Sequence, residues 1–296
     1  MNLIMMRYKL EYFAVLLLRK IILKIPVKCA YFMAELLGLL LYYVIRIRRK
    51  MMFTNLTRVF PEKSASEING IIKRNYIKIC KSAFEYFLIQ KINTDNFECF
   101  GWLEDNQIID EITKQNRGVI LLGGHFDNPE LVTNILRLSG YQMVALVKKQ
   151  NNPFINAMFS KIRGTHGVEV IYKGPSVKDI FRRLKEKKIL ATVADIAVSS
   201  NEGIVIDFCG IPTPTPIGPA KFGLRTNASI IPVFSYRMSD NRHRIKVFRP
   251  LTPDASADTE DKQIVSIMEK YNKLLEDNIR KYPDEWFWMH NRWKHK

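Results

Sequence analysis

Residues 118–130 read GVILLGGHFDNPE, and this stretch decides how the rest of the chain is interpreted. The run GVILL has the length of a buried strand, and two glycines end it. Asn128 followed by Pro129 is typical of a helix start, because Asn caps the first turn and Pro suits the first helical position. The segment therefore predicts a strand, a connection that holds His125, and a helix that runs to about Leu138.

Similar alternation continues on both sides of this segment. Ser64 and Glu67 have the spacing of a capping box, which predicts an amphipathic helix over residues 64–90. Further apolar runs of strand length lie at residues 143–147, 168–172, 189–194, 204–208, 230–234 and 245–248, and stretches that fit helices lie at 153–162, 176–187, 219–225 and near 264–279. This order predicts an α/β fold: a mixed, mostly parallel sheet flanked by helices, with an N-terminal helical segment that anchors the chain to a membrane.

Composition narrows the class of protein. The chain has 296 residues, of which 47% are hydrophobic and 25% charged, so global disorder is excluded. Its four cysteines are scattered without a CxxC pair, which argues against a disulfide framework and against a thiolate zinc site. The net charge of +17 favours negatively charged partners: nucleic acid, anionic lipid headgroups or phosphorylated substrates.

Residues 1–50 differ from the remainder of the chain. They hold ten basic and two acidic residues, yet they include the apolar run 29–45, in which Glu35 is the one charge. A helix of that length reaches about 25 Å, the short limit for crossing a bilayer. We interpret residues 1–50 as a membrane anchor and residues 51–296 as the α/β domain, with spanning, re-entrant and flat arrangements all open. Two buried core helices with solvated basic ends are the alternative. Nucleic acid is disfavoured, because the charges flank aliphatic runs.

The segment best suited to catalysis is the connection at residues 123–130. His125 lies in the connection and Glu130 lies in the first helical turn, so the turn lets a carboxylate approach an imidazole. A carboxylate held against a histidine fixes its tautomer and stabilises the imidazolium, which makes the pair a general base for a hydroxyl or amine. The spacing equally fits a packed histidine in a loop where Asp127 and Asn128 act only as caps.

Other chemical features are less specific. Asp195 ends an apolar strand, so it lines a site or caps a turn. Thr215 and Gly218 precede a helix at Pro219, where backbone N–H groups can receive a phosphate or carbonyl oxygen, although the Thr-Pro-Thr-Pro run also fits a rigid turn. No G-x-S-x-G motif is present and His125 has no partner cluster of metal ligands, so we expect neither a serine hydrolase nor a metal site.

Two basic segments have open interpretations. Residues 182–188 form a basic helix that docks an acidic carrier or is simply solvated. The tail holds Trp286, Trp288 and Trp293 beside Lys and Arg, and these rings form an interfacial belt or close the core.

Several ordered motifs resemble a known superfamily. GGHFDNPE is similar to the signature of the lysophospholipid acyltransferases, in which His is followed by four residues and then by Asp or Glu. Three further stretches resemble the bacterial lipid A biosynthesis (lauroyl/myristoyl) acyltransferase branch: NLTRVFPEKSASEI at 55–68, Asp195 followed by GIVIDFCGIPTPTPIGPAKFGLRTNASIIPVF at 203–234, and YPDEWFWMHNRWK at 282–294. The similarity extends over nearly the whole chain.

The resemblance implies a membrane-associated enzyme of lipopolysaccharide synthesis on the cytoplasmic side of the bacterial inner membrane. It implies transfer of a fatty acyl chain from an acyl carrier protein or coenzyme A thioester to a hydroxyl of a lipid A precursor or related glycolipid. His125 would be the general base and Glu130 the residue that orients it. Arg163 would face a phosphate or the oxyanion, an arrangement that suits the guanidinium fork. Asp195, Thr215 and Gly218 would bind substrate.

The implied partners are the lipid acceptor, the thioester donor and the anionic membrane surface, with no cofactor, no metal and no nucleic acid. Two rival functions stay open from the residues. One is an acyltransferase-fold lipid-binding protein without catalysis. The other is a metal-dependent phosphohydrolase that uses His125 and Asp127.

Overall fold

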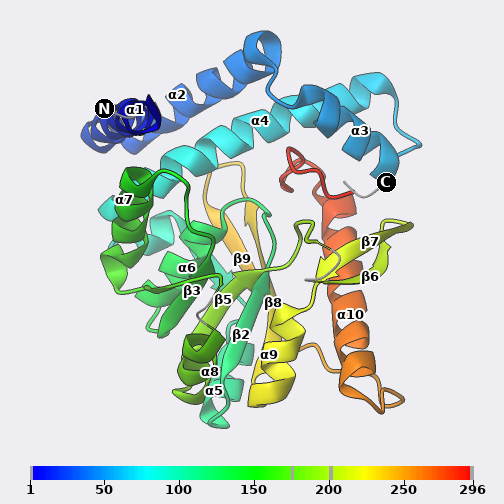
Figure 1. Cartoon of the computed structure of the whole chain (residues 1–296). Coiled ribbons are helices and arrows are strands. Elements are labelled where there is room, and N and C mark those ends of the chain that lie inside the picture. Colours follow the sequence, from blue (N-terminus) through cyan, green and yellow to red (C-terminus); the bar gives the residue numbers. More distant parts are fainter. Residues whose placement is uncertain (1–2, 175–176, 200–202, 294–296) are drawn as a thin grey trace.

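A seven-stranded sheet forms the centre of the protein in the computed structural model, which describes residues 3–174, 177–199 and 203–293 (Figure 1). The strand order is β1–β9–β8–β2–β5–β3–β4. The strand bounds are β1 Gly101–Glu104, β2 Val119–Gly123, β3 Met143–Val147, β4 Glu169–Tyr172, β5 Ile189–Val193, β8 Ser229–Arg237 and β9 His243–Val247. Strands β8, β2, β5, β3 and β4 are parallel, whereas β9 is antiparallel to β8. The predicted mixed, mostly parallel sheet is confirmed.

A separate antiparallel hairpin consists of β6 (Gly203–Phe208) and β7 (Ile211–Pro216). The strand predicted at 204–208 is therefore present, but it lies outside the main sheet. The Thr-Pro-Thr-Pro run forms β7, and a two-stranded hairpin tolerates these prolines because both strands are edges.

Helices cover both faces of the sheet. On one face lie α5 (Gln107–Lys114), α6 (Pro129–Leu138) and α7 (Pro153–Arg163), and on the other lie α8 (Val177–Lys185), α9 (Gly218–Thr226) and α10 (Glu260–Lys281). Alternate residues of β2 pack on opposite faces of the sheet, since Leu121 lies in one core cluster and Leu122 in the other. The predicted helix start at Ser176 lies outside the described residues.

A layer of N-terminal helices crosses one end of the sheet: α1 (Leu3–Lys24), α2 (Val27–Leu40) continued by a π-turn to Ile45, α3 (Arg49–Val59) and α4 (Ala65–Leu88). Helix α4 begins at the predicted capping box, in which Ser64 and Glu67 bond each other's backbone N–H groups. The segment Val27–Ile45 is long and apolar enough to cross a membrane by length and composition.

Helix α2 nevertheless lies against α4 and presents small residues to it. Ala30, Ala34 and Gly38 are its buried residues and recur every four positions. A Cβ atom at Gly38 would stand 2.6 Å from the Cα of Ile77, so the two helix backbones touch there. The opposite side of α2 carries exposed apolar side chains such as Phe32, which is 63% exposed.

Exposed large apolar side chains concentrate in this layer. Of those in the described residues, all but Val177, Val205 and Met238 lie between residues 3 and 47. The interpretation of residues 1–50 as two buried core helices therefore does not describe α1 and α2, which leave an apolar face uncovered by the chain.

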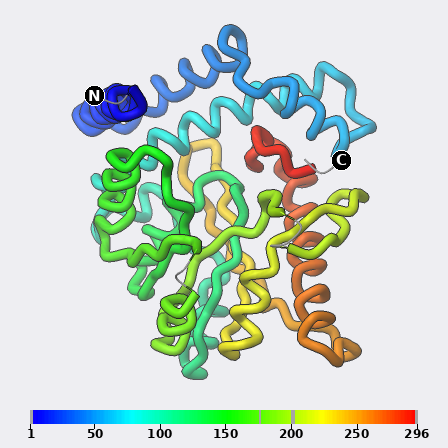
Figure 2. Tube along the Cα trace, viewed as in Figure 1, coloured from blue at the N-terminus to red at the C-terminus, as the bar shows by residue number. Residues whose placement is uncertain are grey.

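The C-terminal segment returns beneath the same helical layer (Figure 2). The side-chain amide of Asn75 in α4 donates to the carbonyl of Trp286 at 2.7 Å, and that of Asn55 in α3 donates to the carbonyl of Trp288 at 3.1 Å. Trp286, Trp288 and Trp293 are at most 2% exposed, so they close the core and the interfacial-belt interpretation is wrong.

Candidate active site

His125 and Asp195 meet because their strands are neighbours in the sheet. Strand β2 pairs with β5 in parallel, with Gly123 opposite Val193, and each of the two polar residues lies two positions beyond that last pair. The carboxyl ends of parallel strands open at one edge, where α/β proteins usually place their sites. The edge at β2 and β5 therefore holds an imidazole beside a carboxylate.

The carboxylate of Asp195 accepts three hydrogen bonds. The backbone N–H of His125 donates to Oδ2 at 2.6 Å, the indole Nε1 of Trp286 donates to Oδ2 at 2.8 Å, and Oδ1 lies 2.8 Å from Nδ1 of His125. The Asp195 side chain is fully buried, whereas that of His125 is 36% exposed. The acid is therefore fixed in the interior and the ring reaches outward.

Electrostatics reinforce this pair. Burial alone would raise the pKa of Asp195, but the charge and hydrogen bonds of His125, with the bond from Trp286, hold that pKa at about 2. Burial opposes a raised pKa at His125, and the carboxylate of Asp195 outweighs it, so the pKa of the imidazole lies above its usual value. An ionised Asp195 favours the tautomer with the proton on Nδ1, which leaves the Nε2 lone pair for a substrate.

Glu130 does not contact His125, contrary to the expectation from their spacing. Its carboxylate accepts from Arg163 Nε at 2.9 Å to each oxygen and from Nη2 at 2.5 Å. The reason is that Arg163 ends α7 beside the first turn of α6, where its guanidinium fork takes the carboxylate. The negative charge of Glu130 still contributes to the raised pKa of His125, as the smallest of the named causes.

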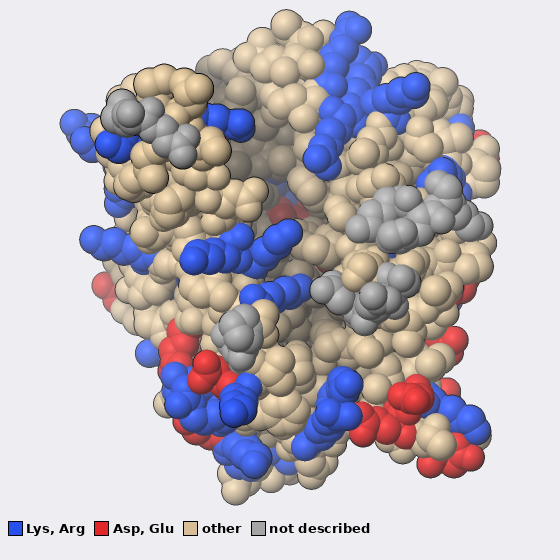
Figure 3. Space-filling view, in the orientation of Figure 1, with Lys and Arg blue, Asp and Glu red and all other residues tan. Residues whose placement is uncertain are grey.

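A cavity of about 330 Å³ opens at His125 and extends between α6 and the sheet. Its inner wall is apolar, made by residues such as Leu121, Phe126, Val132, Leu136, Ala145, Val193 and Val233. Its polar lining includes His125, Glu130, Arg163, Lys148 and Lys173. The space-filling view shows Lys and Arg side chains beside a hollow on this side of the molecule (Figure 3). Sequence reasoning missed both lysines, which follow the ends of β3 and β4.

Thr215 and Gly218 are not among the residues that line this cavity. The Thr215 hydroxyl is buried and accepts from Arg292 Nη2 at 2.7 Å. Arg292 is itself fully buried, and burial lowers its pKa to about 10. The expected part of Thr215 and Gly218 in substrate binding stays a prediction.

The C-terminal segment also holds the His125 loop from outside. The backbone N–H of Phe287 donates to the carbonyl of His125 at 2.9 Å, and the N–H of Asp127 donates to the carbonyl of Glu285 at 2.9 Å. Sequence reasoning gave this tail no part in the site, although its Trp/Arg-rich ending was the available signal.

Asp127, the other acid of the motif, points away from the cavity. Its side chain is fully buried and paired with Arg237 and His243. Across the described ranges of the chain, no group of three His, Cys, Asp or Glu side chains is placed to hold a metal ion.

The chain is similar to known acyltransferases over nearly its whole length. Residues 1–295 match the family described as bacterial lipid A biosynthesis acyltransferase. The chain belongs to this family. The resemblance inferred from the motifs is confirmed, and the protein is an acyltransferase that acts on a lipid.

Curated relatives are distant in sequence, and those named for lipid A biosynthesis cover most of the chain. Lipid A biosynthesis acyltransferase 2 of Shigella flexneri is 23% identical over 82% of this chain and 77% of its own length. The lipid A biosynthesis lauroyltransferase of Escherichia coli K12 is 21% identical over 93% and 88%. A phosphatidylinositol mannoside acyltransferase of Mycolicibacterium smegmatis is 24% identical over 60% and 57%.

Proposed function

We propose that the protein transfers a fatty acyl chain from an acyl thioester to a hydroxyl of a lipid A precursor or a related glycolipid, with His125 as the general base. One observation carries the proposal. The Nδ1 atom of His125 is engaged by the buried carboxylate of Asp195, while the same ring lines the opening of an apolar cavity. Family membership supports the reaction class.

In the proposed reaction, Nε2 of His125 removes the proton of the acceptor hydroxyl as its oxygen attacks the thioester carbonyl. The carbonyl becomes a tetrahedral oxyanion, which then expels the thiolate, and the imidazolium returns its proton to that sulfur. Asp195 stabilises the imidazolium between these steps. No covalent acyl-enzyme is required.

Arg163 is our candidate for the oxyanion donor. Its Nε and Nη2 are bound to Glu130, but its Nη1 is buried and has no hydrogen-bond partner among the described residues. Arg163 lines the cavity that also holds His125, and a guanidinium with an unpaired N–H group is suited to a developing negative charge. Glu130 then acts by fixing the guanidinium.

The apolar wall of the cavity is proposed to hold the acyl chain, because burial of methylene groups is its main source of binding energy. Lys148 and Lys173 place positive charge at the polar part of the cavity. Phosphate groups occur both in the donor thioester and in phosphorylated glycolipids, and either fits these charges.

We propose that the protein rests on the bilayer through the apolar face of α1 and α2, on the cytoplasmic side of the inner membrane. The exposed apolar side chains are accompanied by basic residues at both ends of α2, including Lys24, Lys28 and Arg46. The close contact of α2 with α4 favours a helix that lies flat on the surface over one that crosses.

The test is a reaction of purified protein with lipid A precursor in mixed micelles, followed by mass spectrometry. Acyl carrier protein and coenzyme A thioesters are supplied in separate reactions. A mass gain of one acyl chain, lost in H125Q and kept in the presence of a chelator, supports the proposal. No gain with either donor, or full activity of H125Q, contradicts it.

A further inference from the structure

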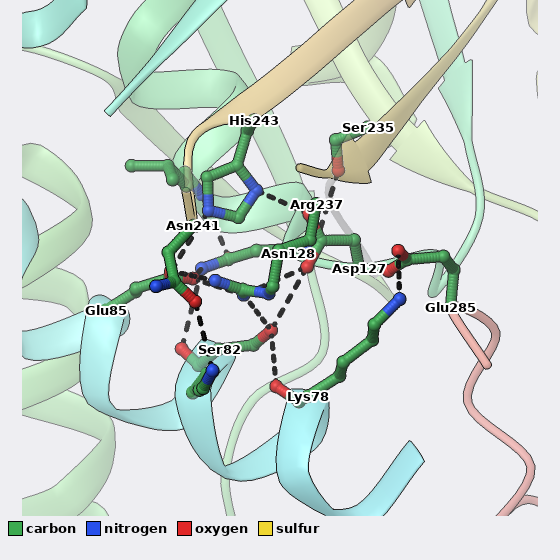
Figure 4. Close-up of polar contacts among 12 residues, drawn as sticks. Lys78, Ser82, Glu85, Asp127, Asn128, Ser235, Arg237, Asn241, His243 and Glu285 are labelled. Atoms are coloured by element: carbon green, nitrogen blue, oxygen red, sulfur yellow. Dashed lines mark hydrogen bonds and ion pairs between the residues drawn. The ribbon is translucent and has the colours of Figure 1, made fainter. Parts of the chain in front are cut away.

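Four ionisable side chains lie together behind the His125 loop and outside the cavity: Glu85 of α4, Asp127 of the loop, Arg237 at the end of β8 and His243 at the start of β9 (Figure 4). Their side chains are 0–3% exposed. We call them the buried charge cluster. The proposed reaction uses none of them.

Asp127 is the member that belongs to the loop. Arg237 Nη2 donates to its Oδ1 at 3.0 Å, and Nδ1 of His243 bonds its Oδ2. The backbone of Asp127 has a φ of 53°, in the left-handed region that residues other than glycine rarely adopt. Asp adopts this region more often than most residues do, and here its side-chain bonds to Arg237 and His243 hold the backbone there.

Glu85 extends the cluster to the next loop residue and to the helical layer. Its Oε2 accepts from the side-chain amide of Asn128 at 2.9 Å, and its Oε1 accepts from the hydroxyl of Tyr31 in α2 at 2.8 Å. Asn128 also caps α6, since its Oδ1 accepts from the N–H of Leu131 at 3.1 Å. One carboxylate therefore ties α2 to the start of α6.

The charges of the cluster balance when His243 is an imidazolium. Both ring nitrogens of His243 face carboxylate oxygens, those of Asp127 and Glu85, so each nitrogen needs a proton to bond. Burial and the nearby Arg237 oppose the charge, but the two carboxylates raise the pKa of His243 to about 9. Two negative and two positive groups are thus held together in the protein interior at neutral pH.

The C-terminal segment closes the remaining side. The Lys78 ammonium lies 2.5 Å from the carboxylate of Glu285, whose backbone carbonyl accepts the N–H of Asp127. The loop is therefore held through the side chains of Asp127 and Asn128 on one side and through the backbone N–H of Asp127 on the other, two residues from His125.

We propose that the buried charge cluster positions the His125 imidazole against Asp195, which makes Asp127 and His243 positioning residues for acyl transfer. This inference rests on the proposed function and adds residues that it leaves unused. Removal of these contacts lets the loop relax toward ordinary backbone angles, and the imidazole of His125 then loses its contact with Asp195.

The deciding variant is D127N/H243Q, because it removes one charge of each sign and leaves Glu85 paired with Arg237. We expect it to fold, and to lower kcat about tenfold or more while each KM changes less than twofold. The acid limb of the pH profile, which reports His125, should move to lower pH as the ring leaves Asp195. The matched control is D240N, an exposed residue of the same β8–β9 turn.

A second readout needs no substrate. The imidazole of His125 is titrated by NMR, with its signals assigned from their loss in H125Q. Lys173 and Glu130 also influence this ring and are unchanged in the variants. The pKa of His125 should fall in D127N/H243Q and stay at the wild-type value in D240N. If no acyl transfer is found for the wild type, the proposed function fails, and the titration alone decides the positioning role.

A folded D127N/H243Q protein with wild-type kcat and an unchanged His125 pKa overturns the proposal. If this variant does not fold, N128S decides, since serine keeps the helix cap but removes the amide donor to Glu85. A lower kcat with a lower His125 pKa in N128S supports positioning. Wild-type values of both contradict it.

Discussion

Replacement of Asp195 by Asn is the sharpest perturbation of the site, because the two side chains have the same shape. Two N–H groups, from the His125 backbone and the Trp286 indole, point at one oxygen of Asp195, so the Asn carbonyl oxygen must take that place. Its NH₂ group then faces Nδ1 of His125, where Oδ1 was 2.8 Å away. An amide donor there forces the ring proton onto Nε2, and the base loses its lone pair.

We expect kcat of D195N to fall roughly 10³–10⁴-fold, the scale seen when a histidine base is held in the wrong tautomer. Initial rates of acyl transfer at saturating donor and acceptor give kcat, and thermal unfolding shows whether the variant is folded. D240N is the matched control, since Asp240 is an exposed acid of the β8–β9 turn that does not line the cavity. A folded D195N enzyme within tenfold of wild type would refute the tautomer argument.

Three further predictions concern stability and membrane contact. The pKa of His243 is about 9 in the folded protein against about 6.5 in the unfolded chain, so its contribution of about 3 kcal/mol to the free energy of unfolding is complete below pH 6.5 and is lost as pH rises through 9. Denaturant melts should show this fall in the free energy of unfolding with pH in wild type and lack it in H243Q. Gly38→Val forces a Cβ onto the backbone of Ile77 and should cost about 1–3 kcal/mol, read as a lower Tm; an unchanged Tm contradicts the α2–α4 contact. The pair Phe32→Ser and Leu36→Ser removes about 3 kcal/mol or more of apolar burial and should weaken binding to anionic vesicles roughly a hundredfold in sedimentation; undiminished binding contradicts a flat α2.

Local patterns predicted local structure well. The stretch GVILLGGHFDNPE predicted the strand, the loop and the helix that the structure contains as β2, the His125 connection and α6. The capping box gave the start of α4. These signals work because a cap or an apolar run acts within a few residues. Strand β1 and helix α5 were not predicted, since they are short, with four and eight residues.

Local sequence patterns could not identify the carboxylate that pairs with His125. Glu130 is five positions away and was the natural choice, but the true neighbour, Asp195, is 70 residues away. Its proximity follows from the pairing of β2 with β5, and strand order depends on the whole chain. The buried charge cluster could not be predicted for the same reason, because its members come from α4, the loop, β8 and β9 and meet only in the folded chain.

The role of His125 as the base of an acyl transfer is open to a kinetic test. Its most direct test is the pH dependence of kcat/KM for transfer from a thioester to lipid A precursor, measured for wild type and H125Q. We expect an acid limb in wild type near the elevated pKa of His125, and in H125Q a rate lower by roughly 10²-fold or more without that limb. A folded H125Q enzyme that keeps both the rate and the acid limb would contradict it.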